Sequence, residues 1–461
     1  MTGPAWKPDG ARNGWGSQGA LPGTGDAQRL LMIAEKFPPF NQSGSARPFY
    51  FAKYLPEFGY VPQVLASTLL AADERDSTLL LELPPAVHVQ RTPRLLSPLV
   101  TRLRAARRGD AGRRPARSTK PPANAPNGPL AAARWASDAF GYLGWWSHWE
   151  LDWAALATLA GAWQARRTRP QLIWASGPHF RNFVVAARLG AWLRLPLVID
   201  LRDPWTYGSL WRPRTDRSAQ AERAFAAQVL SRAARVVFTS PLTLEAMHER
   251  FPELPRERWL TITNGFDDTP VEPLRDVSSE RCLFRYIGML NERRQPDVLI
   301  RAFARASVDP EFRTRAVLEF IGNAGGHEPK ALLAPGSDVR FLGHVARAES
   351  LRYMFGSDIN ILLQTISEGQ DVISGKAFDY LHAKKPILGI VDESGGDAWL
   401  LRDTGAGTLA PWHDEAAIER ELRAAFQRWK SGSGVAQVPD VSRYARRNQA
   451  AQLAALFDEV I

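Results

Sequence analysis

One short segment carries the densest set of side chains that could bind a charged ligand. Asp371 and Asp379 are separated by seven residues, among them the run Ser374-Gly375-Lys376. Serine is a good N-cap, and glycine leaves the backbone N–H groups at the start of a helix uncovered. Those groups and the helix dipole attract a phosphate or diphosphate, and such an anion would also explain a lysine in the first turn. The same pattern fits an ordinary capped helix with surface charges.

The two carboxylates suit other parts of such a ligand. Asp379 could accept hydrogen bonds from both hydroxyls of a ribose, and Asp371, in the preceding loop, could accept them from a sugar. Arg294 follows another strand-like run, in the loop "GMLNERRQ", at the position of a phosphate-facing loop. These residues predict a site for a phosphorylated ligand that carries sugar hydroxyls.

Loops in the first half of the chain add further candidates. Gly44 lies in a loop with Pro and Gly and would let the backbone approach a ligand, with Arg47 as a candidate anion contact. The dinucleotide pattern GxGxxG is absent from this loop. Asp203 follows a later strand and is either a ligand-contacting group or an ordinary turn carboxylate. His179 is interpreted as structural.

Strand-like apolar runs and helical patterns alternate in two sets that could position these side chains. Continuous Val, Ile and Leu runs indicate parallel sheets covered on both faces. The fold class is therefore α/β, with two doubly wound Rossmann-like domains facing a cleft, and ligands bind beyond the carboxyl ends of such strands. Helices are expected at 46–59, 181–194, 242–251 and 296–307, and strands at 30–34, 171–176, 195–201, 235–240, 260–263, 283–288, 317–322, 338–344, 358–364 and 386–391.

The domain boundaries follow from the same patterns. A Gly- and Pro-rich start without the apolar core of a signal peptide indicates a disordered tail. We expect this tail over 1–28, an N-terminal domain over 29–266, a linker over 267–280, a C-terminal domain over 281–440, and a helix within 441–461 that packs back on the N-terminal domain.

Composition restricts the class of protein. The 461 residues exceed one typical core, and 45% hydrophobic and 23% charged residues are typical of a soluble globular chain. A single cysteine, Cys282, excludes a disulfide framework and favours a reducing compartment. No apolar run approaches the ~18 residues of a membrane-spanning helix. We therefore expect a cytoplasmic chain that is not integral to a membrane.

The net charge of +10 favours an acidic partner. Much of the excess lies in 102–120, within a basic flexible insertion expected over 98–125, and an amphipathic Trp-rich segment follows at 145–163. A solvated insertion, a contact with anionic lipid and a nucleic-acid contact are alternatives for the basic run, and the tryptophans also fit a core helix. We favour a basic and aromatic surface that touches a membrane, because indole suits the membrane interface.

Most of the chain resembles the retaining, nucleotide-sugar-dependent glycosyltransferases of family 4, which have the two-domain GT-B fold. The resemblance covers segments 30–66, 171–205, 259–267 and 283–410. The most specific part is "ISGKAFDYLHAKKPILGI" with the preceding aspartate, because the family separates two acidic residues there by seven others. The resemblance implies a nucleotide-sugar-binding C-terminal domain and an acceptor-side N-terminal domain.

The resemblance also assigns roles to individual residues. Catalysis would be electrostatic, with cations and helix N–H groups stabilising the leaving diphosphate. The implied assignments are ribose on Asp379, the transferred sugar on Asp371, the diphosphate on Ser374, Gly375, Lys376 and Arg294, and a glycine loop at Gly44. Arg47 and Asp203 are the candidates for the acceptor side.

This chain departs from the family at several positions. Both signature acids are Asp where Glu is usual, so each carboxylate reaches less far by one methylene. Met289 replaces the family's arginine after the strand glycine, and Ser176 stands where some relatives have a histidine. These changes bear on the sugar and on efficiency more than on the fold.

The expected function is transfer of a sugar, with retention of configuration, from a nucleotide-diphosphate sugar to a glycan or lipid-linked acceptor. Such a hexosyltransferase-type enzyme would serve polysaccharide or lipid-linked glycan biosynthesis, and a peripheral position on the inner face of the membrane agrees with the basic and aromatic segments. No cofactor, obligatory metal or nucleic-acid partner is expected. A nucleotide-sugar 2-epimerase of the same fold and a non-catalytic basic scaffold that binds membrane or nucleic acid are the alternatives.

Overall fold

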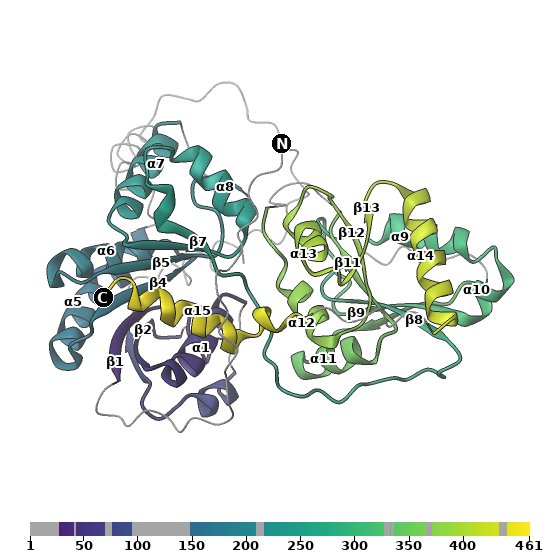
Figure 1. The fold of residues 1–461 in the computed structure, drawn as a ribbon, viewed down its shortest axis with the longest axis horizontal. Coiled ribbons are helices and arrows are strands. Elements are labelled where there is room, and N and C mark those ends of the chain that lie inside the picture. Colours follow the sequence, from purple (N-terminus) through teal and green to yellow (C-terminus); the bar gives the residue numbers. More distant parts are fainter. Residues whose placement is uncertain are drawn as a thin grey trace, which may run out of the picture.

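The computed structural model describes residues 27–40, 43–69, 76–94, 148–208, 216–326, 332, 336–365, 371–432 and 440–461. The basic insertion expected over 98–125 lies outside the described residues, as does most of the tail expected over 1–28. These residues form two α/β domains that lie next to each other (Figure 1). The predicted fold class, two doubly wound domains that face each other, is confirmed. In the described part of the chain, no helix is both long enough and apolar enough to span a membrane.

The first domain is built on a seven-stranded parallel sheet in the order β3-β2-β1-β4-β5-β6-β7. Its strands are β1 (Gln28–Ile33), β2 (Tyr60–Ser67), β3 (His88–Thr92), β4 (Leu172–Gly177), β5 (Leu197–Leu201), β6 (Arg235–Phe238) and β7 (Trp259–Thr261). Its helices are α1 (Ser43–Tyr54), η1 (Leu55–Phe58), η2 (Thr78–Glu82), α5 (His148–Thr168), α6 (Arg181–Leu193), α7 (Asp216–Ser231), α8 (Pro241–Arg250) and η3 (Arg256–Arg258).

Both faces of this sheet are buried. Leu31 and Ile33 of β1 belong to a hydrophobic cluster with α5, α6, α7 and α8. Leu30 and Met32 point to the other face and pack in a second cluster with α1. Alternate residues of one apolar strand thus supply two cores, as the continuous apolar runs predict.

The second domain has a six-stranded parallel sheet in the order β10-β9-β8-β11-β12-β13. Its strands are β8 (Cys282–Ile287), β9 (Ala316–Ile321), β10 (Val339–Gly343), β11 (Ile359–Leu363), β12 (Ile387–Val391) and β13 (Gly407–Pro411). Its helices are α9 (Asp297–Ala306), α10 (Pro310–Arg315), α11 (Arg347–Gly356), α12 (Gly375–Ala383), α13 (Gly396–Thr404) and α14 (Glu415–Lys430).

All ten expected strands are present, with ends shifted by a few residues, and β2, β3 and β13 were missed. Pro62 lies inside β2, and proline is rare in an interior strand because it donates no ladder hydrogen bond. The sequence of β3, His-Val-Gln-Arg-Thr, lacks a continuous apolar run. Gly407 and Pro411 begin and end β13. Pairing with a neighbouring strand overrides weak local signals at all three places.

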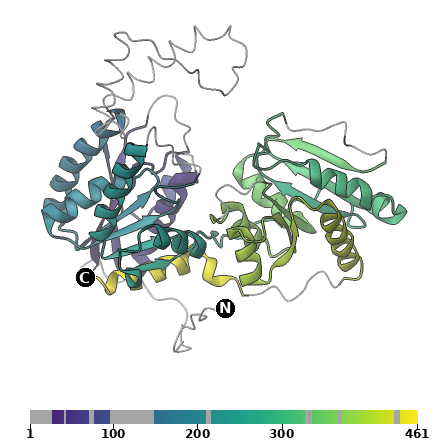
Figure 2. The ribbon, with the colours of Figure 1, turned by 90° about the horizontal axis from the view of Figure 1, so that it is seen from above.

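The chain crosses between the domains twice, and the two crossings lie side by side. The N–H of Phe266 donates to the carbonyl of Tyr444 at 3.1 Å, and the N–H of Arg446 donates to the carbonyl of Phe266 at 2.9 Å. After η5 (Ser442–Tyr444), helix α15 (Arg446–Asp458) packs on α1 of the first domain, as the views of Figures 1 and 2 show. The C-terminal helix therefore belongs to the core of the first domain.

Residues 267–280, expected as a linker, are held against the second domain. The carbonyl of Leu274 accepts from a guanidinium N–H of Arg285 at 2.9 Å, and the N–H of Leu274 donates to the carbonyl of Arg352 at 2.8 Å. The beginning of the segment is anchored on the other side, because Asp267 pairs with Lys53 and accepts from the hydroxyl of Tyr54 on α1.

Candidate functional site

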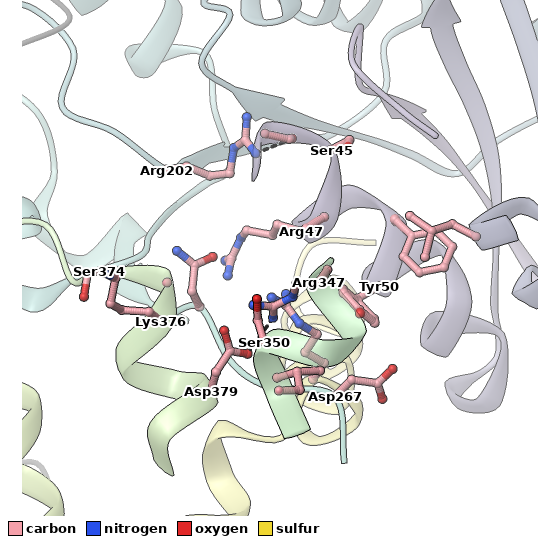
Figure 3. A pocket seen from close by; sticks show the side chains of 18 of the residues that line it. Ser45, Arg47, Tyr50, Arg202, Asp267, Arg347, Ser350, Ser374, Lys376 and Asp379 are labelled. Carbon is pink, nitrogen blue, oxygen red and sulfur yellow. Dashed lines mark hydrogen bonds and ion pairs between the residues drawn. The ribbon is translucent and has the colours of Figure 1, made fainter. Parts of the chain in front are cut away.

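A cleft of about 2520 Å³ lies between the two domains (Figure 3). Its walls follow the carboxyl ends of strands in both sheets, where ligands of such folds bind. The cleft brings together residues from many distant parts of the chain. Of the residues singled out from the sequence, its lining includes Gly44, Arg47, Asp203, Arg294, Ser374, Gly375, Lys376 and Asp379.

The N-terminus of α12 opens into this cleft. Ser374 has extended backbone angles at the N-cap, and its own N–H donates to Asp397 at 2.8 Å. A Cβ added at Gly375 would meet no atom within 4 Å, so the first turn is uncovered. The N–H groups of Gly375 and Lys376 have no hydrogen-bond partner among the described residues. This helix start can receive an anion.

Lys376 turns back from the first turn of α12 to the end of β8. Its Nζ donates to the hydroxyl of Tyr286 at 2.9 Å and lies 4.1 Å from the centroid of that ring. Burial lowers the pKa of Lys376 well below its usual value, and the nearby charge of Arg294 adds to the effect. An anion bound beside Nζ would reverse that shift, since an opposite charge favours the ammonium.

Arg294 supplies a second cation on the same side of the cleft. It ends a tight turn after β8, in which its N–H donates to the carbonyl of Asn291 at 2.8 Å. Its guanidinium makes no hydrogen bond or ion pair with any residue that the structure describes. Two neighbouring cations and two uncovered N–H groups therefore point to a ligand with several negative charges, such as a diphosphate.

Asp379 is 7% exposed and lies one turn further along α12. Its Oδ1 accepts from Nη2 of Arg347 at 2.7 Å (Figure 3). The Arg347 side chain is 66% exposed, and the carboxylate of Asp379 raises the pKa of this guanidinium. The expected ribose-binding carboxylate thus has an arginine partner that a ligand can displace.

Asp371 is not among the residues that line the cleft. Its carboxylate accepts a hydrogen bond from the hydroxyl of Tyr207, and its carbonyl accepts from Thr243 Oγ1 at 3.1 Å. Both partners belong to the first domain, so Asp371 bridges the domains. Burial raises the pKa of Asp203 nearby, and the negative charge of Asp371 adds to that effect.

Arg47 has a different role from the anion contact expected of it. Its guanidinium is buried and pairs with Asp200 at 2.8 Å. It also donates to the carbonyls of Ile262 and Thr263, at 2.8 and 2.5 Å. A guanidinium has five N–H groups, and these contacts use most of them. Arg47 therefore ties α1 to the sheet instead of offering a free charge to a ligand.

Gly44, which the sequence placed in a loop, is the second residue of α1, and it is contacted by Arg202, which we did not single out from the sequence. The guanidinium of Arg202 donates to the carbonyl of Gly44, to that of Gly177 at 2.9 Å and to that of Pro178 at 2.6 Å. His179 directly follows Pro178 and lines the cleft. Burial lowers its pKa to about 4, so this imidazole is neutral near pH 7.

Tertiary structure adds two further cleft residues that the sequence did not reveal. Arg347 begins α11 in the segment "HVARAES". A positive charge in the first turn is unfavourable for the helix dipole, so this arginine could have indicated a nearby negative charge. Arg446 begins α15, and its guanidinium lies 4.2 Å from the centroid of the Tyr50 ring. No local signal places Arg446 in the cleft. Among the described residues, no group of three or more His, Cys, Asp or Glu side chains could hold a metal ion.

Comparisons with known proteins agree with this architecture. The family model "Glycosyltransferase Family 4" matches residues 123–269, and no curated protein sequence matches the chain. The structure of Anabaena HepE (Alr3699) with UDP-glucose shares 15% identity and a TM-score of 0.56, with 94% of this chain and 99% of that chain covered. This chain and HepE therefore share a fold.

Two further solved structures have the same fold. Sucrose-phosphate synthase from Thermosynechococcus elongatus shares 13% identity and a TM-score of 0.58, covering 94% of this chain and 98% of that chain. The lipopolysaccharide outer core galactosyltransferase WaaB shares 12% identity and a TM-score of 0.55, covering 94% and 100%. The two domains define the GT-B fold, and the chain resembles the glycosyltransferases of family 4.

Proposed function

We propose that this chain is a glycosyltransferase that moves a sugar from a nucleotide-diphosphate sugar to an acceptor. The observation that carries the proposal is the start of α12, where uncovered N–H groups lie beside Lys376 and Arg294. The resemblance to family 4 and the UDP-glucose bound to HepE, a protein of the same fold, support a nucleotide sugar as donor.

Breaking the bond between the sugar and the diphosphate leaves negative charge on the diphosphate. Lys376, Arg294 and the N–H groups of α12 stabilise that charge more strongly as it develops, which lowers the barrier. The pKa of Lys376 recovers as the charge appears, because an anion favours the ammonium. We assign this electrostatic role to the two cations.

The ribose binds Asp379 after displacing Arg347. Asp371 adjoins Val372 of the cleft lining, and the transferred sugar reaches its carboxylate by displacing the hydroxyl of Tyr207. The acceptor, a glycan or lipid-linked hydroxyl compound, lies against the first domain near Asp203. Closure of the domains excludes water from the bond that breaks. We expect retention of the anomeric configuration, and a role in polysaccharide or lipid-linked glycan biosynthesis, from the resemblance to family 4.

The first test measures thermal unfolding of the full chain with UDP-, GDP- and ADP-sugars. A donor at about 100 times its Kd stabilises the fold by roughly 2.7 kcal/mol, which is a clear shift in Tm. Lys376→Ala should strongly reduce the shift, and Lys385→Ala, beyond the other end of α12, should keep it. If none of the donors changes the Tm of the wild-type chain, the proposal is wrong.

The second test follows the donor that binds. Release of nucleoside diphosphate that depends on an added acceptor supports the transferase, and NMR of the product reports its anomeric configuration. Conversion of the donor to its 2-epimer without an acceptor would instead identify the epimerase of the same fold.

A further inference from the structure

Helices α5 and α6 form one layer on the first domain. Their buried residues share a hydrophobic cluster with the same face of the sheet. They also approach each other closely, because a Cβ at Gly161 would lie 2.6 Å from Cδ1 of Leu189. Figures 1 and 2 both place this layer on the side of the first domain opposite to the second domain. The outer sides of the two helices therefore form one surface, which faces away from the cleft.

This surface exposes large apolar side chains. Leu159 and Trp163 of α5 are 62% and 50% exposed, and Trp192 of α6 is 55% exposed. The guanidinium of Arg167 lies 3.6 Å from the centroid of the Trp163 ring. The other large apolar side chains that are exposed in the described part of the chain lie singly on separate elements. A cluster of exposed indoles needs a partner that is apolar on one side and polar on the other.

Positive charge predominates on these two helices. The acidic residues of α5, Glu150 and Asp152, lie within its first five residues, before Leu159 and Trp163. From residue 153 to residue 196 the chain contains no Asp and no Glu. The exposed arginines of this stretch are Arg166, Arg167, Arg169, Arg188 and Arg194. Guanidinium groups bind phosphate oxygens, and the absence of carboxylates leaves them without competing partners in this stretch.

We propose that the outer surface of α5 and α6 binds a membrane that contains anionic lipid. The arginines contact the lipid phosphates, while Leu159, Trp163 and Trp192 enter the interface between head groups and acyl chains. A nucleic acid would engage the arginines but would leave the apolar side chains without a role. Docking by this surface leaves the cleft open. The proposal does not depend on the donor or on the reaction.

The test measures co-sedimentation of the full chain with vesicles of phosphatidylcholine, with and without phosphatidylglycerol. We expect binding to the mixed vesicles only. Arg166→Glu combined with Arg188→Glu should weaken that binding by about tenfold or more, since each basic residue near an anionic surface contributes to affinity. Arg313→Glu combined with Arg420→Glu changes the net charge equally at exposed positions of the second domain, and it should bind nearly as the wild type does.

A second variant separates lipid from nucleic acid. Trp163→Ser combined with Trp192→Ser should weaken vesicle binding and make the remainder more sensitive to salt, because the apolar contribution is lost. Unchanged circular dichroism and Tm show that each variant is folded. Vesicle binding that both α5/α6 variants retain, or that the second-domain control loses equally, would overturn the proposal. So would a wild-type chain that binds a duplex oligonucleotide but not the mixed vesicles.

Discussion

At the scale of the residue, Lys376 has an unusual environment in the cleft. Its ammonium is partly withdrawn from water beside Tyr286, and the positive charge of Arg294 repels it. A charge in such a place costs free energy unless an anion compensates it. The site is therefore arranged for a ligand that brings negative charge, and such a ligand would raise the pKa of the Lys376 amine.

We expect UDP binding to be accompanied by proton uptake at Lys376. In the free protein the lowered pKa leaves this amine partly uncharged at pH values above it. A bound diphosphate raises the pKa, so affinity should fall as pH rises through the interval between the two pKa values. Calorimetric titrations at one pH, in two buffers with different ionisation enthalpies, measure the uptake.

The control for proton uptake is a side chain that cannot ionise. Lys376→Met should lose the uptake and about 1.5–3 kcal/mol of UDP binding, typical of a hydrogen bond to a charged group. Lys385→Met should behave as the wild type does. A binding heat of the wild-type chain that is independent of the buffer would contradict the prediction.

The roles of Asp379 and Lys376 should be distinguishable by comparing the binding of UDP with that of pyrophosphate. Asp379→Ala is expected to weaken UDP binding by about tenfold, because hydrogen bonds to a carboxylate are lost, and to leave pyrophosphate binding unchanged or slightly stronger. Lys376→Ala should weaken both ligands. Glu393→Ala, an exposed carboxylate of the same domain, serves as control. Equal losses of UDP and pyrophosphate in Asp379→Ala would show that this carboxylate does not bind the ribose.

At the scale of the element, two glycines allow β8, β9 and α12 to meet at the site. Gly288 has φ of +147°, and a Cβ there would lie 2.3 Å from Nζ of Lys376. Gly322 has φ of +134°, and a Cβ there would lie 2.3 Å from the carbonyl oxygen of Gly288. The ends of both strands are therefore packed backbone to backbone beneath the lysine, and side chains would force them apart.

Gly288→Ala should cost about 1–3 kcal/mol of unfolding free energy and should also weaken UDP binding about as much as Lys376→Met does, because the new methyl displaces Lys376. Gly432→Ala is the matched control, since Gly432 has φ of +67° but no atom within 4 Å of a Cβ. Chemical denaturation and UDP titration measure the two effects. Full UDP affinity in folded Gly288→Ala would refute the close approach.

At the scale of the whole molecule, the last helix of the chain completes the domain that begins it. Helix α15 packs on α1, and the ring of Phe457 lies 5.1 Å from that of Tyr60. The hydroxyl of Tyr60 also donates to Asp458 at 2.5 Å. Because the chain returns next to its first crossing at Phe266, the two domains share a double connection that constrains their separation.

Phe457→Ala should therefore destabilise the first domain although Phe457 follows the second domain in the sequence. The loss should be about 3–5 kcal/mol, typical of a buried phenylalanine, whereas Ile461→Ala at the exposed end should cost about 0.5 kcal/mol or less. Hydrogen exchange followed by mass spectrometry should show faster exchange in α1 and unchanged exchange in α14. Acceleration confined to the second domain would contradict this arrangement.

The sequence by itself determined ten of the thirteen strands in the described part of the chain and most of the candidate site. Apolar runs at 30–34 and 283–288 predicted strands because a strand buried on both faces needs continuous hydrophobic residues. The helix start at Ser374 was readable from local capping chemistry. Strands such as β2 were missed, because their pairing partners override local propensity.

Only the tertiary structure decided what each charged side chain faces. Arg47 and Arg294 both follow first strands of their domains, yet Arg47 pairs with buried Asp200, while Arg294 makes no ion pair with a described residue. Arg347 and Arg446 enter the cleft from distant helices. Capping and strand propensity act over a few residues and can be read locally. Ion pairing depends on distances in space, which are set when the two domains pack.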